Sequence, residues 1–203
     1  MKPIVLASSS PRRRRLLLEL GVRFSVRVPD VDEQPLPGEL PGPHVRRLAL
    51  AKARAVAREL EPGRGAQWVV GADTVVVLDG RILGKPRDAG DAEDMLARLS
   101  GRTHEVLTGV ALVPAEGGRA STAVVRSRVE MKPFGDAVIR RYVAGGEPLD
   151  KAGAYAVQGH GRHLVARVSG SLTNVVGLPL ERLRRLLTRA GVSVHPREGA
   201  GRC

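Results

Sequence analysis

The sequence predicts a globular chain that mixes α-helices with β-strands. Apolar runs such as 4–7 are typical of buried strands, whereas apolar residues at helical spacing between residues 43 and 60 indicate an amphipathic helix. Segments of both kinds follow one another along the chain. With 203 residues, 42% of them hydrophobic, the chain is long enough to bury a full core as one domain or as two small lobes.

The first strand, 4–7, leads through three serines into a helix with clear boundaries. Ser10 suits the N-cap, Pro11 the first helical position and Gly21 the C′ position. Such a helix start offers backbone N–H groups and the positive end of the helix dipole to an anion. The arginines at 12–15 oppose that dipole, so either a bound phosphate explains them or they form a solvated basic face.

The rest of the chain is expected to form further strands and helices, and residues 1–195 are expected to form a single domain. The expected strands are 24–28, the run from 68 to 74, a short strand returning from a turn at 79–80, 104–113, 120–131 and 164–168. The expected helices are 43–60, 88–99, 137–144 and a last helix that ends near 191. We expect a small-residue loop at 150–159 and a disordered tail at 196–203.

Residues 71–86 place an acid and an amine where chemistry usually occurs. A buried strand is expected to deliver Asp73 and Thr74 at its carboxyl end. Asp79-Gly80 is typical of a type I′ hairpin turn, and the returning strand is expected to end at Gly84-Lys85-Pro86. The acid and the lysine are therefore expected near each other at one edge of a sheet. The alternative is an N-cap aspartate and a solvated lysine.

Two more segments offer candidate site residues. The acids at 30–33 lie in a proline-rich loop after a strand, where they either hold a divalent cation through oxygen ligands or simply keep the loop polar. Lys52 lies on or beside the apolar stripe of the helix 43–60, where a lysine either extends its amine to solvent or has a function.

The net charge of +12 suggests a polyanionic partner, such as a nucleotide, a nucleic acid or an acidic membrane surface. Arginine, alanine, glycine and proline are all plentiful, as in a GC-rich coding sequence, so part of this charge can be compositional. Lysine is retained at only five positions, where its compact amine suits a phosphate oxygen. Aromatic residues are scarce, which argues against a stacking surface for single-stranded nucleic acid.

Several classes of protein are excluded or disfavoured. No apolar run approaches the roughly 20 residues that span a bilayer, and the start of the chain lacks the layout of a signal peptide, so we expect a cytoplasmic protein with no membrane partner. The single cysteine, Cys203, allows neither a disulfide framework nor a thiolate metal site within one chain. His160 and His163 are expected on the surface rather than as metal ligands.

Short motifs in a specific order resemble the Maf family of nucleoside triphosphate pyrophosphatases over about residues 4–190. They are Leu-Ala-Ser-Ser-Ser-Pro-Arg-Arg at 6–13, Asp-Glu at 32–33, Lys-Ala at 52–53, Gly-Ala-Asp-Thr at 71–74, Gly-Lys-Pro at 84–86, Leu-Ser-Gly at 99–101, Thr-Gly-Val at 108–110, Asp-Lys-Ala-Gly-Ala-Tyr at 150–155, Gln158-Gly159 and Asn-Val-Val-Gly-Leu-Pro at 174–179. The resemblance implies an α/β fold similar to that of the inosine-triphosphate pyrophosphatases. Its features would be a central mixed twisted sheet flanked by helices, two lobes with a cleft, and often a homodimer.

The resemblance also implies a reaction: hydrolysis of a nucleoside triphosphate between the α- and β-phosphates with a divalent cation such as Mg²⁺ or Mn²⁺. By position, the catalytic residues would be Asp73, Glu33, Lys52 and Lys85, with Asp73 and Glu33 as metal ligands. The substrate-binding residues would be Ser8, Arg12, Arg13, Thr74 and Gln158, of which Arg12, Thr74 and Gln158 match positions associated with substrate choice. Whether Asp73 acts as base, as metal ligand or as both stays open.

The Gly-Ala-Asp-Thr motif with the later Gln158 resembles the branch of the family that acts on dTTP and UTP, in a house-cleaning or nucleotide-pool role. The alternatives are a 7-methyl-GTP pyrophosphatase, a nucleotide sensor without turnover, and a nucleic-acid-binding regulator of septum formation. The scarce aromatic residues and dispersed arginines make nucleic acid the less favoured partner. A pyrophosphate-release assay distinguishes these alternatives.

Overall fold

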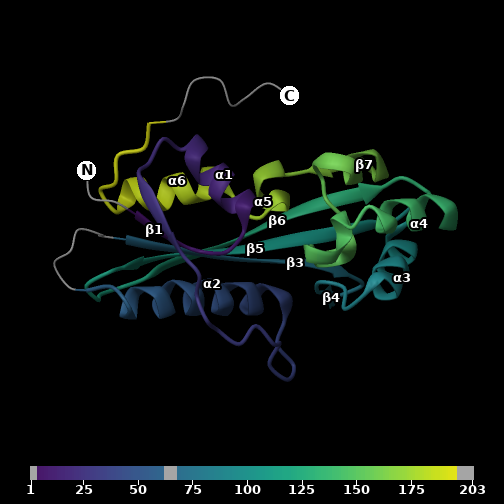
Figure 1. Ribbon diagram of the computed structural model, residues 1–203. Helices are drawn as coiled ribbons and strands as arrows, with labels where there is room; N and C mark the ends of the chain where they lie inside the picture. The colour runs from purple at the N-terminus through teal and green to yellow at the C-terminus, as the bar shows by residue number, and fades with distance from the viewer. Residues whose placement is uncertain (1–3, 62–67, 196–203) are drawn as a thin grey trace. The chain divides into compact units, whose positions relative to one another are not determined.

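The computed structural model describes residues 4–61 and 68–195 (Figure 1). The chain divides into two compact units. Unit 1 comprises residues 1–73, 108–125 and 177–203, and unit 2 comprises residues 74–107 and 126–176. Three long strands, β3, β5 and β6, each contribute to both units.

The strands form a mixed sheet in the order β2-β1-β3-β5-β6-β7, with β4 paired to β3. Their bounds are β1 Ile4–Ala7, β2 Phe24–Arg27, β3 Trp68–Leu78, β4 Arg81–Leu83, β5 Thr103–Pro114, β6 Ser121–Met131 and β7 Val165–Ser169. β1 pairs in parallel with both β2 and β3, whereas β4 runs antiparallel to β3 and β7 antiparallel to β6. The expected α/β fold with a central mixed sheet flanked by helices is confirmed.

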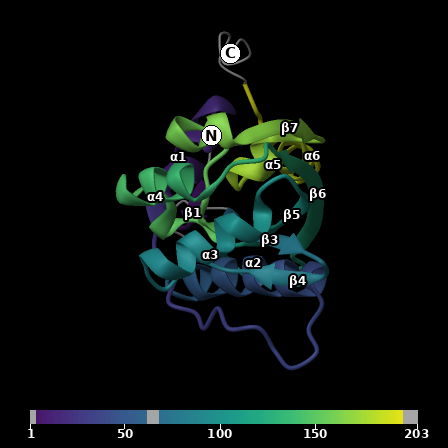
Figure 2. The ribbon, with the colours of Figure 1, turned by 90° about the vertical axis from the view of Figure 1, so that its right-hand side faces the viewer.

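Unit 1 places helices on both faces of its strands. These helices are α1 Pro11–Glu19, α2 Pro41–Arg58 and α6 Leu180–Arg189. α2 lies along one face, and α1 and α6 lie on the other (Figures 1 and 2). Every residue of β1 is buried, as expected for a parallel strand covered on both sides.

Two glycines allow α2 to lie directly on the strands of unit 1. A Cβ atom on Gly71 of β3 would lie 2.2 Å from the carbonyl oxygen of Ala49, and one on Gly109 of β5 would lie 2.1 Å from that of Val45. Because no side chain fits there, the helix backbone approaches the sheet closely. This close packing carries Lys52 of α2 toward the segment of β3 that follows Gly71.

Unit 2 buries a separate apolar cluster. Its helices are α3 Ala89–Leu99, α4 Asp136–Ala144 and α5 Leu172–Val176, with 3₁₀ turns η1 Glu147–Asp150, η2 Ala152–Ala154 and η3 Gly159–Leu164. Leu96 and Leu99 of α3 pack with Ile139 and Val143 of α4 and with side chains of the neighbouring strands. The span expected as a loop at 150–159 contains η2 and the ends of η1 and η3, while residues 155–158 form a loop as expected.

The local signals for turns and caps are confirmed. Ser10 caps α1, its Oγ accepting from the Arg13 N–H at 3.4 Å, and Gly21 follows the helix with φ of 65°. Positive φ at both Asp79 (51°) and Gly80 (76°) makes the β3–β4 connection the expected type I′ turn. Elsewhere the element boundaries differ from expectation by one or a few residues, and the short helix α5 was not expected.

The expected position of Asp73 within its strand is wrong. β3 runs on to Leu78, so Asp73 and Thr74 lie in its middle rather than at its carboxyl end. The parallel neighbour β1, however, ends at Ala7 opposite Gly71. Asp73 therefore lies just beyond the carboxyl end of β1, where a strand neighbour no longer covers that side of β3.

Some expectations stay predictions. Asp73 belongs to unit 1 and Lys85 to unit 2, so their proximity and a cleft between two lobes stay predicted, as does the single domain over 1–195. The tail 196–203, with Cys203, lies outside the described residues. Among the described residues, no helix is long and apolar enough to cross a membrane.

Candidate active site

A lysine and two carboxylates meet in unit 1. The Nζ atom of Lys52 lies 2.7 Å from Oδ1 of Asp73 and 2.7 Å from Oε1 of Glu33. The Lys52 and Asp73 side chains are only 7% and 8% exposed, whereas that of Glu33 is 55% exposed. Burying a charge is costly unless it is paired, so each member of this triad makes the burial of the others tolerable.

The triad excludes one of the two interpretations of Lys52, an amine that extends to solvent. The side chain belongs to the buried stripe of α2 that faces the strands, and its amine ends on two carboxylates instead of extending to solvent. A lysine that only covered apolar surface would place its amine in water. The triad is thus a built polar site, with Asp73 buried in β3 and Glu33 reaching in from an exposed loop.

Arg13 and Ser8 stand at the same end of β1. Ser8 is buried directly after that strand, and its Oγ accepts from the Ser10 N–H at 3.1 Å and from Nη1 of Arg13 at 3.4 Å. Nε of Arg13 donates to the carbonyl oxygen of Gly177 at 2.8 Å. The guanidinium is thereby held in place from two sides, by the strand-to-helix turn and by the segment before α6.

The electrostatics tie Arg13 to the triad. Burial lowers the pKa of the Arg13 guanidinium, while the nearby charges of Asp73 and Glu33 raise it and that of Arg12 lowers it. Arg13 is thus close enough to both carboxylates for their charges to act on it. Two cations and two carboxylates in one place form an arrangement suited to phosphate oxygens and to a hard cation.

The acidic pair also suits a divalent cation chemically. Carboxylate oxygens are the ligands that Mg²⁺ and Mn²⁺ prefer, and Mg²⁺ is commonly held by one or two carboxylates together with substrate phosphates. Asp73 and Glu33 converge on a single positive group, the Lys52 amine. Over residues 4–61 and 68–195 there is no group of three or more His, Cys, Asp or Glu residues that could hold a metal. A cation here would need phosphate oxygens or water to complete its ligands.

The predicted site residues divide between the two units. Unit 1 contains Ser8, Arg12, Arg13, Glu33, Lys52 and Asp73. Unit 2 contains Thr74, Lys85 and Gln158. Hydrogen bonds, ion pairs or mutual charge effects bring together five of the residues in unit 1: Ser8, Arg13, Glu33, Lys52 and Asp73. The sixth, Arg12, acts electrostatically on Arg13.

In unit 2, Gln158 is exposed on a loop that is held firmly at its base. Glu147 of η1 accepts through Oε2 from the Gly161 N–H at 2.8 Å. The hydroxyl oxygen of Tyr142 accepts from the Ala156 N–H at 3.1 Å. The backbone on both sides of Gln158 is therefore anchored, while Gln158 itself is exposed. Lys85 is also exposed, just beyond the end of β4.

A second polar cluster, which the sequence interpretation missed, lies just before α2 and in its first turns. Oε1 and Oε2 of Glu39 accept from Nε and Nη2 of Arg47, each at 2.6 Å, and Oε2 also accepts from His44 Nδ1 at 2.9 Å and from the Leu36 N–H at 3.2 Å. The hydrogen bond from Arg47 holds the pKa of Glu39 well below its ordinary value, against the opposing effect of burial. We call Glu39, His44 and Arg47 the loop anchor.

The missed residues left only faint signals. His44 and Arg47 are one helical turn apart at the start of the helix, with Glu39 shortly before, a spacing at which side chains meet. In a chain so rich in arginine, however, Arg47 looks like any solvated residue. Gly177, whose carbonyl oxygen holds Arg13, lies inside the quoted motif Asn-Val-Val-Gly-Leu-Pro, but a backbone acceptor has no signature of its own.

Comparisons with known proteins add to this geometry. The family model described as "Maf-like protein" matches residues 3–190. The dTTP/UTP pyrophosphatase of Geobacter sp. (strain M21) is 55% identical over 177 residues, which are 87% of this chain and 90% of that protein. Those of Myxococcus xanthus (strain DK1622) and Symbiobacterium thermophilum are 53% and 50% identical, over 93% and 99% of this chain and 93% and 100% of theirs.

A solved structure is similar in a looser sense. The nucleoside-triphosphatase (dITP/XTP pyrophosphatase) of Mycobacterium abscessus aligns over 92% of this chain and 94% of its own, at 21% identity and a TM-score of 0.44. At that TM-score we draw no conclusion from the likeness.

Proposed function

The chain belongs to the Maf family, and from this premise we propose that it is a nucleoside triphosphate pyrophosphatase that converts dTTP and UTP to the monophosphate and pyrophosphate. Relatives named for this activity match it over nearly their whole length at 50–55% identity. The single structural observation that supports the activity is the triad of Glu33, Lys52 and Asp73 beside Arg13.

The reaction consumes one water. The water oxygen bonds to the α-phosphorus, the bond from that phosphorus to the bridging oxygen breaks, and pyrophosphate leaves while the water gives up a proton. Arg13 and Lys52 would stabilise negative charge on the phosphate oxygens as the leaving group departs, with Ser8 orienting Arg13. Asp73, buried and paired with Lys52, would take the proton of the water. Lys85 and Arg12 would add positive charge along the triphosphate.

A divalent cation, Mg²⁺ or Mn²⁺, is part of the proposal. Asp73 and Glu33 would hold it, because they offer hard oxygen atoms directed at one point. When bound, such a cation neutralises phosphate charge and polarises the phosphorus centre. Within the site, the chain's own cations and carboxylates nearly cancel, so a triphosphate of about four negative charges needs this additional positive charge.

The choice of base is assigned to Gln158 and Thr74, with Arg12. The Gln158 amide offers one donor and one acceptor, which match the carbonyl and N3–H of a uracil or thymine edge. A base whose edge leaves these groups unpaired should be rejected. The names of the relatives include both dTTP and UTP, so we expect tolerance of the 5-methyl group.

Further parts of the proposal concern the setting of the enzyme. Free nucleoside triphosphates are cytoplasmic, which supports a cytoplasmic location. The resemblance to the Maf family supports a homodimer. We propose no role for nucleic acid as a partner, because the five aromatic residues of the chain offer no stacking surface.

The test is pyrophosphate release from dTTP, UTP, CTP, GTP and 7-methyl-GTP, with Mg²⁺ and with excess chelator. We expect dTTP and UTP to be hydrolysed well ahead of the others, with pyrophosphate and monophosphate as products and loss of turnover in chelator. An Asp73→Asn preparation serves as the control for contaminating phosphatases. No pyrophosphate from any triphosphate would refute the activity, and a preference for 7-methyl-GTP would refute the proposed base.

A further inference from the structure

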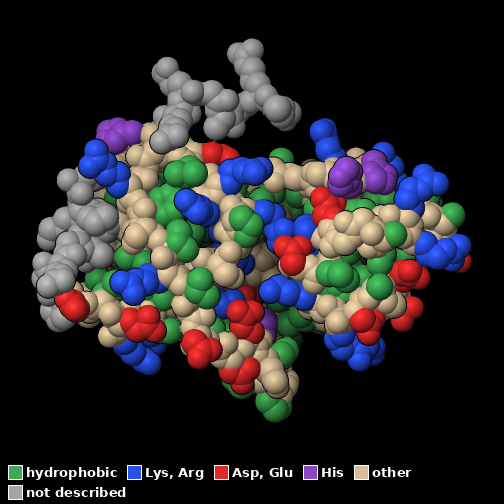
Figure 3. All heavy atoms as spheres, in the orientation of Figure 1, with side chains coloured by type: hydrophobic (Ala, Val, Ile, Leu, Met, Phe, Trp, Pro, Cys, Tyr) green, Lys and Arg blue, Asp and Glu red, His purple; other side chains and the backbone are tan. Residues whose placement is uncertain are grey.

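Glu33 occupies an improbable position for an exposed loop residue. It lies in the segment between β2 and α2, residues 28–40, which is neither helix nor strand and is exposed at most positions. Acidic side chains gather on this loop, which projects beside α2 (Figure 3). Yet Oε1 of Glu33 is held 2.7 Å from a buried amine. Fixing a loop backbone costs about 1–2 kcal/mol per residue in conformational entropy, so contacts elsewhere must hold it.

The loop anchor supplies such contacts at the carboxyl end of the loop. Although most of the segment is exposed, the Glu39 side chain is only 8% exposed. Its carboxylate accepts from the Leu36 N–H of the loop and from His44 and Arg47 of α2. A carboxylate that accepts a bidentate pair from arginine is fixed in orientation as well as position.

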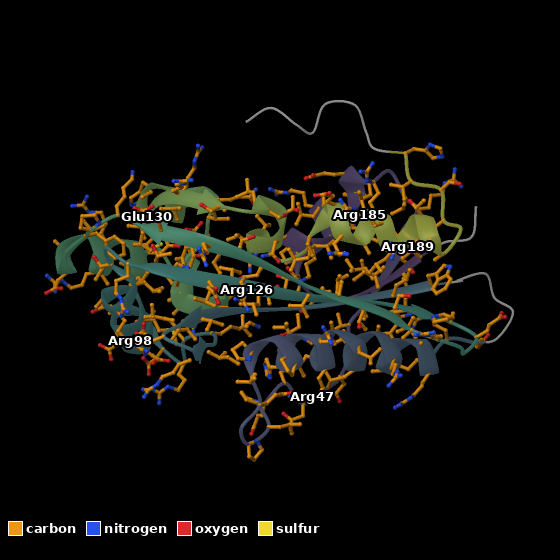
Figure 4. The ribbon with its side chains drawn as sticks, turned by 180° about the vertical axis from the view of Figure 1, so that it is seen from behind. Arg47, Arg98, Arg126, Glu130, Arg185 and Arg189 are labelled. Carbon is orange, nitrogen blue, oxygen red and sulfur yellow. The ribbon has the colours of Figure 1, made fainter. Side chains whose placement is uncertain are left out.

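Arg47 also reaches the residue next to Glu33. Its Nη2 atom donates to the carbonyl oxygen of Gln34 at 3.0 Å. One guanidinium thus binds the loop twice, at the Glu39 carboxylate and at the backbone carbonyl of Gln34, the residue after Glu33. In Figure 4, which labels it, Arg47 extends from the beginning of α2 on the side of this loop.

The two contacts to this part of the loop come from one helix. Lys52 of α2 holds the Glu33 side chain, and Arg47, five positions earlier, holds the Gln34 backbone. Because α2 is fixed on the sheet by close packing at Gly71 and Gly109, both contacts share one rigid support. Because the Glu33 side chain and the backbone of the next residue are held from the same support, the Glu33 carboxylate has little freedom to move away from Lys52 and Asp73.

We propose that Arg47, oriented by Glu39, is a positioning residue that holds the loop so that the Glu33 carboxylate lies on Lys52 beside Asp73. This inference rests on the proposed function, in which Glu33 acts at the site. Arg47 donates hydrogen bonds to Glu39 and to the Gln34 carbonyl oxygen. The bond to Glu39 chiefly raises the pKa of Arg47, and the charge of Asp73 adds to this effect. The positioning effect on catalysis passes through Glu33, whereas a direct effect of the Arg47 charge on Asp73 would remain when Glu33 is replaced.

The test is a double-mutant cycle with Arg47→Ala, Glu33→Gln and the double variant, measured by kcat and KM for dTTP. A displacement of about 1 Å can cost as much as 10²-fold in rate, so we expect Arg47→Ala to lower kcat by about 10-fold or more with a smaller change in KM. In the Glu33→Gln background the same substitution should change kcat less than about twofold, because the group it positions is already lost. An equal loss in both backgrounds would overturn the proposal.

Two controls separate positioning from general damage. Arg46→Ala removes the neighbouring, exposed arginine of the same helix and should leave kcat within about twofold of wild type. Arg47→Lys keeps the charge but lacks the bidentate geometry, so it should recover only part of the loss. If Arg47→Ala does not fold, Glu39→Gln replaces it in the cycle, since it breaks the same anchor from the other side.

A readout that needs no turnover keeps this proposal distinct from the proposed activity. Hydrogen exchange of the peptide covering residues 32–36 should accelerate at least about 10-fold in Arg47→Ala and Glu39→Gln, and stay unchanged in Arg46→Ala. Unchanged exchange in the first two variants would overturn the proposal even if kcat falls. Accelerated exchange in a protein that hydrolyses no triphosphate would support the anchor and refute the proposed function instead.

Discussion

Two loops, one in each unit, carry predicted site residues, and each is tied down by a glutamate in a different way. In unit 1, Glu39 accepts mainly from the charged side chains of α2, and Glu33 lies on the anchored loop. In unit 2, Glu147 accepts from backbone N–H groups around Gly161, and Gln158 lies on that loop. The first anchor depends on Arg47, whereas the second depends on the loop backbone.

The difference predicts different vulnerabilities. A Cβ atom on Gly161 would lie 2.4 Å from the carbonyl oxygen of Ala156 and 2.6 Å from the Tyr142 hydroxyl, and one on Gly159 would lie 2.3 Å from Oε1 of Glu147. The backbone anchor of unit 2 therefore tolerates no side chain at these glycines. The side-chain anchor of unit 1 leaves the residues of its loop freer to vary. Unit 1 holds a group with a role in the proposed chemistry, and unit 2 holds one that is proposed to read the base.

The largest expected effect tests whether unit 1 supplies the chemistry. Asp73→Asn keeps the shape of the side chain but removes its charge and its basicity, so kcat for dTTP should fall by roughly 10²–10⁴-fold. Steady-state kinetics with purified variant measure it, with circular dichroism to show that the fold is kept. If the Asp73→Asn variant keeps more than about a tenth of the wild-type turnover, Asp73 does not have the proposed catalytic role.

The second effect tests whether the units differ in acid stability. Burial lowers the pKa of His104, which lies in unit 2 with Nε2 2.7 Å from the Tyr155 hydroxyl, to about 4. The unfolded chain binds this proton near pH 6.5, so between pH 6.5 and 4 protons favour unfolding. The free energy of unfolding should therefore fall by about 3 kcal/mol by pH 4, at about 1.4 kcal/mol per pH unit. In unit 1, the hydrogen bond from Arg47 lowers the pKa of Glu39. The contribution of Glu39 to the free energy of unfolding is therefore fully present above the ordinary glutamate pKa and is lost only as the pH falls below it.

The chain contains probes for this comparison. Its single tryptophan, Trp68, belongs to unit 1, and both tyrosines, Tyr142 and Tyr155, belong to unit 2. On acidification from pH 7 to 4, the near-ultraviolet tyrosine signal should change before Trp68 emission does. His104→Gln should flatten the dependence of unfolding free energy on pH in this range. If the free energy of unfolding depends on pH as steeply in His104→Gln as in wild type, the pH dependence does not come from His104.

The third effect tests whether unit 2 reads the base. Gln158→Ala should cost roughly 1–3 kcal/mol in transition-state stabilisation for dTTP and UTP and much less for GTP, because only the pyrimidine edge matches the lost amide. The measurement is kcat/KM for dTTP, UTP, CTP and GTP in both proteins. An unchanged ranking of substrates would show that the base is read elsewhere.

The smallest effect concerns the backbone anchor. Glu147→Gln weakens one acceptor of the Gly161 N–H, so kcat/KM for dTTP should fall by a few fold, equivalent to about 1 kcal/mol for one hydrogen bond. Glu130→Gln on β6, an exposed glutamate of unit 2 labelled in Figure 4, is the matched control and should have no effect. Equal values for the two variants would indicate that Gln158 does not need this anchor.

Much of the fold and part of the site were predictable because the signals are local. The cap at Ser10 and the turn at Asp79-Gly80 each depend on the stereochemistry of a few consecutive residues. The apolar spacing of α2 likewise placed Lys52 on its inward face. The resemblance in motif order then pointed to the family, which the comparisons confirm.

What the sequence by itself determined, then, is the succession of elements, their caps and turns, and the set of polar residues available for chemistry. Only the tertiary structure decided how these residues meet, because the partners are distant along the chain: Lys52 and Asp73 are 21 residues apart, and Arg13 and Gly177 are 164 apart. β3 continues through Asp73 because its charge is paired by a lysine from another element, a compensation that no local pattern records. Arg47, one basic residue among 33, acquires its proposed role from the Gln34 carbonyl that the folded loop brings to it.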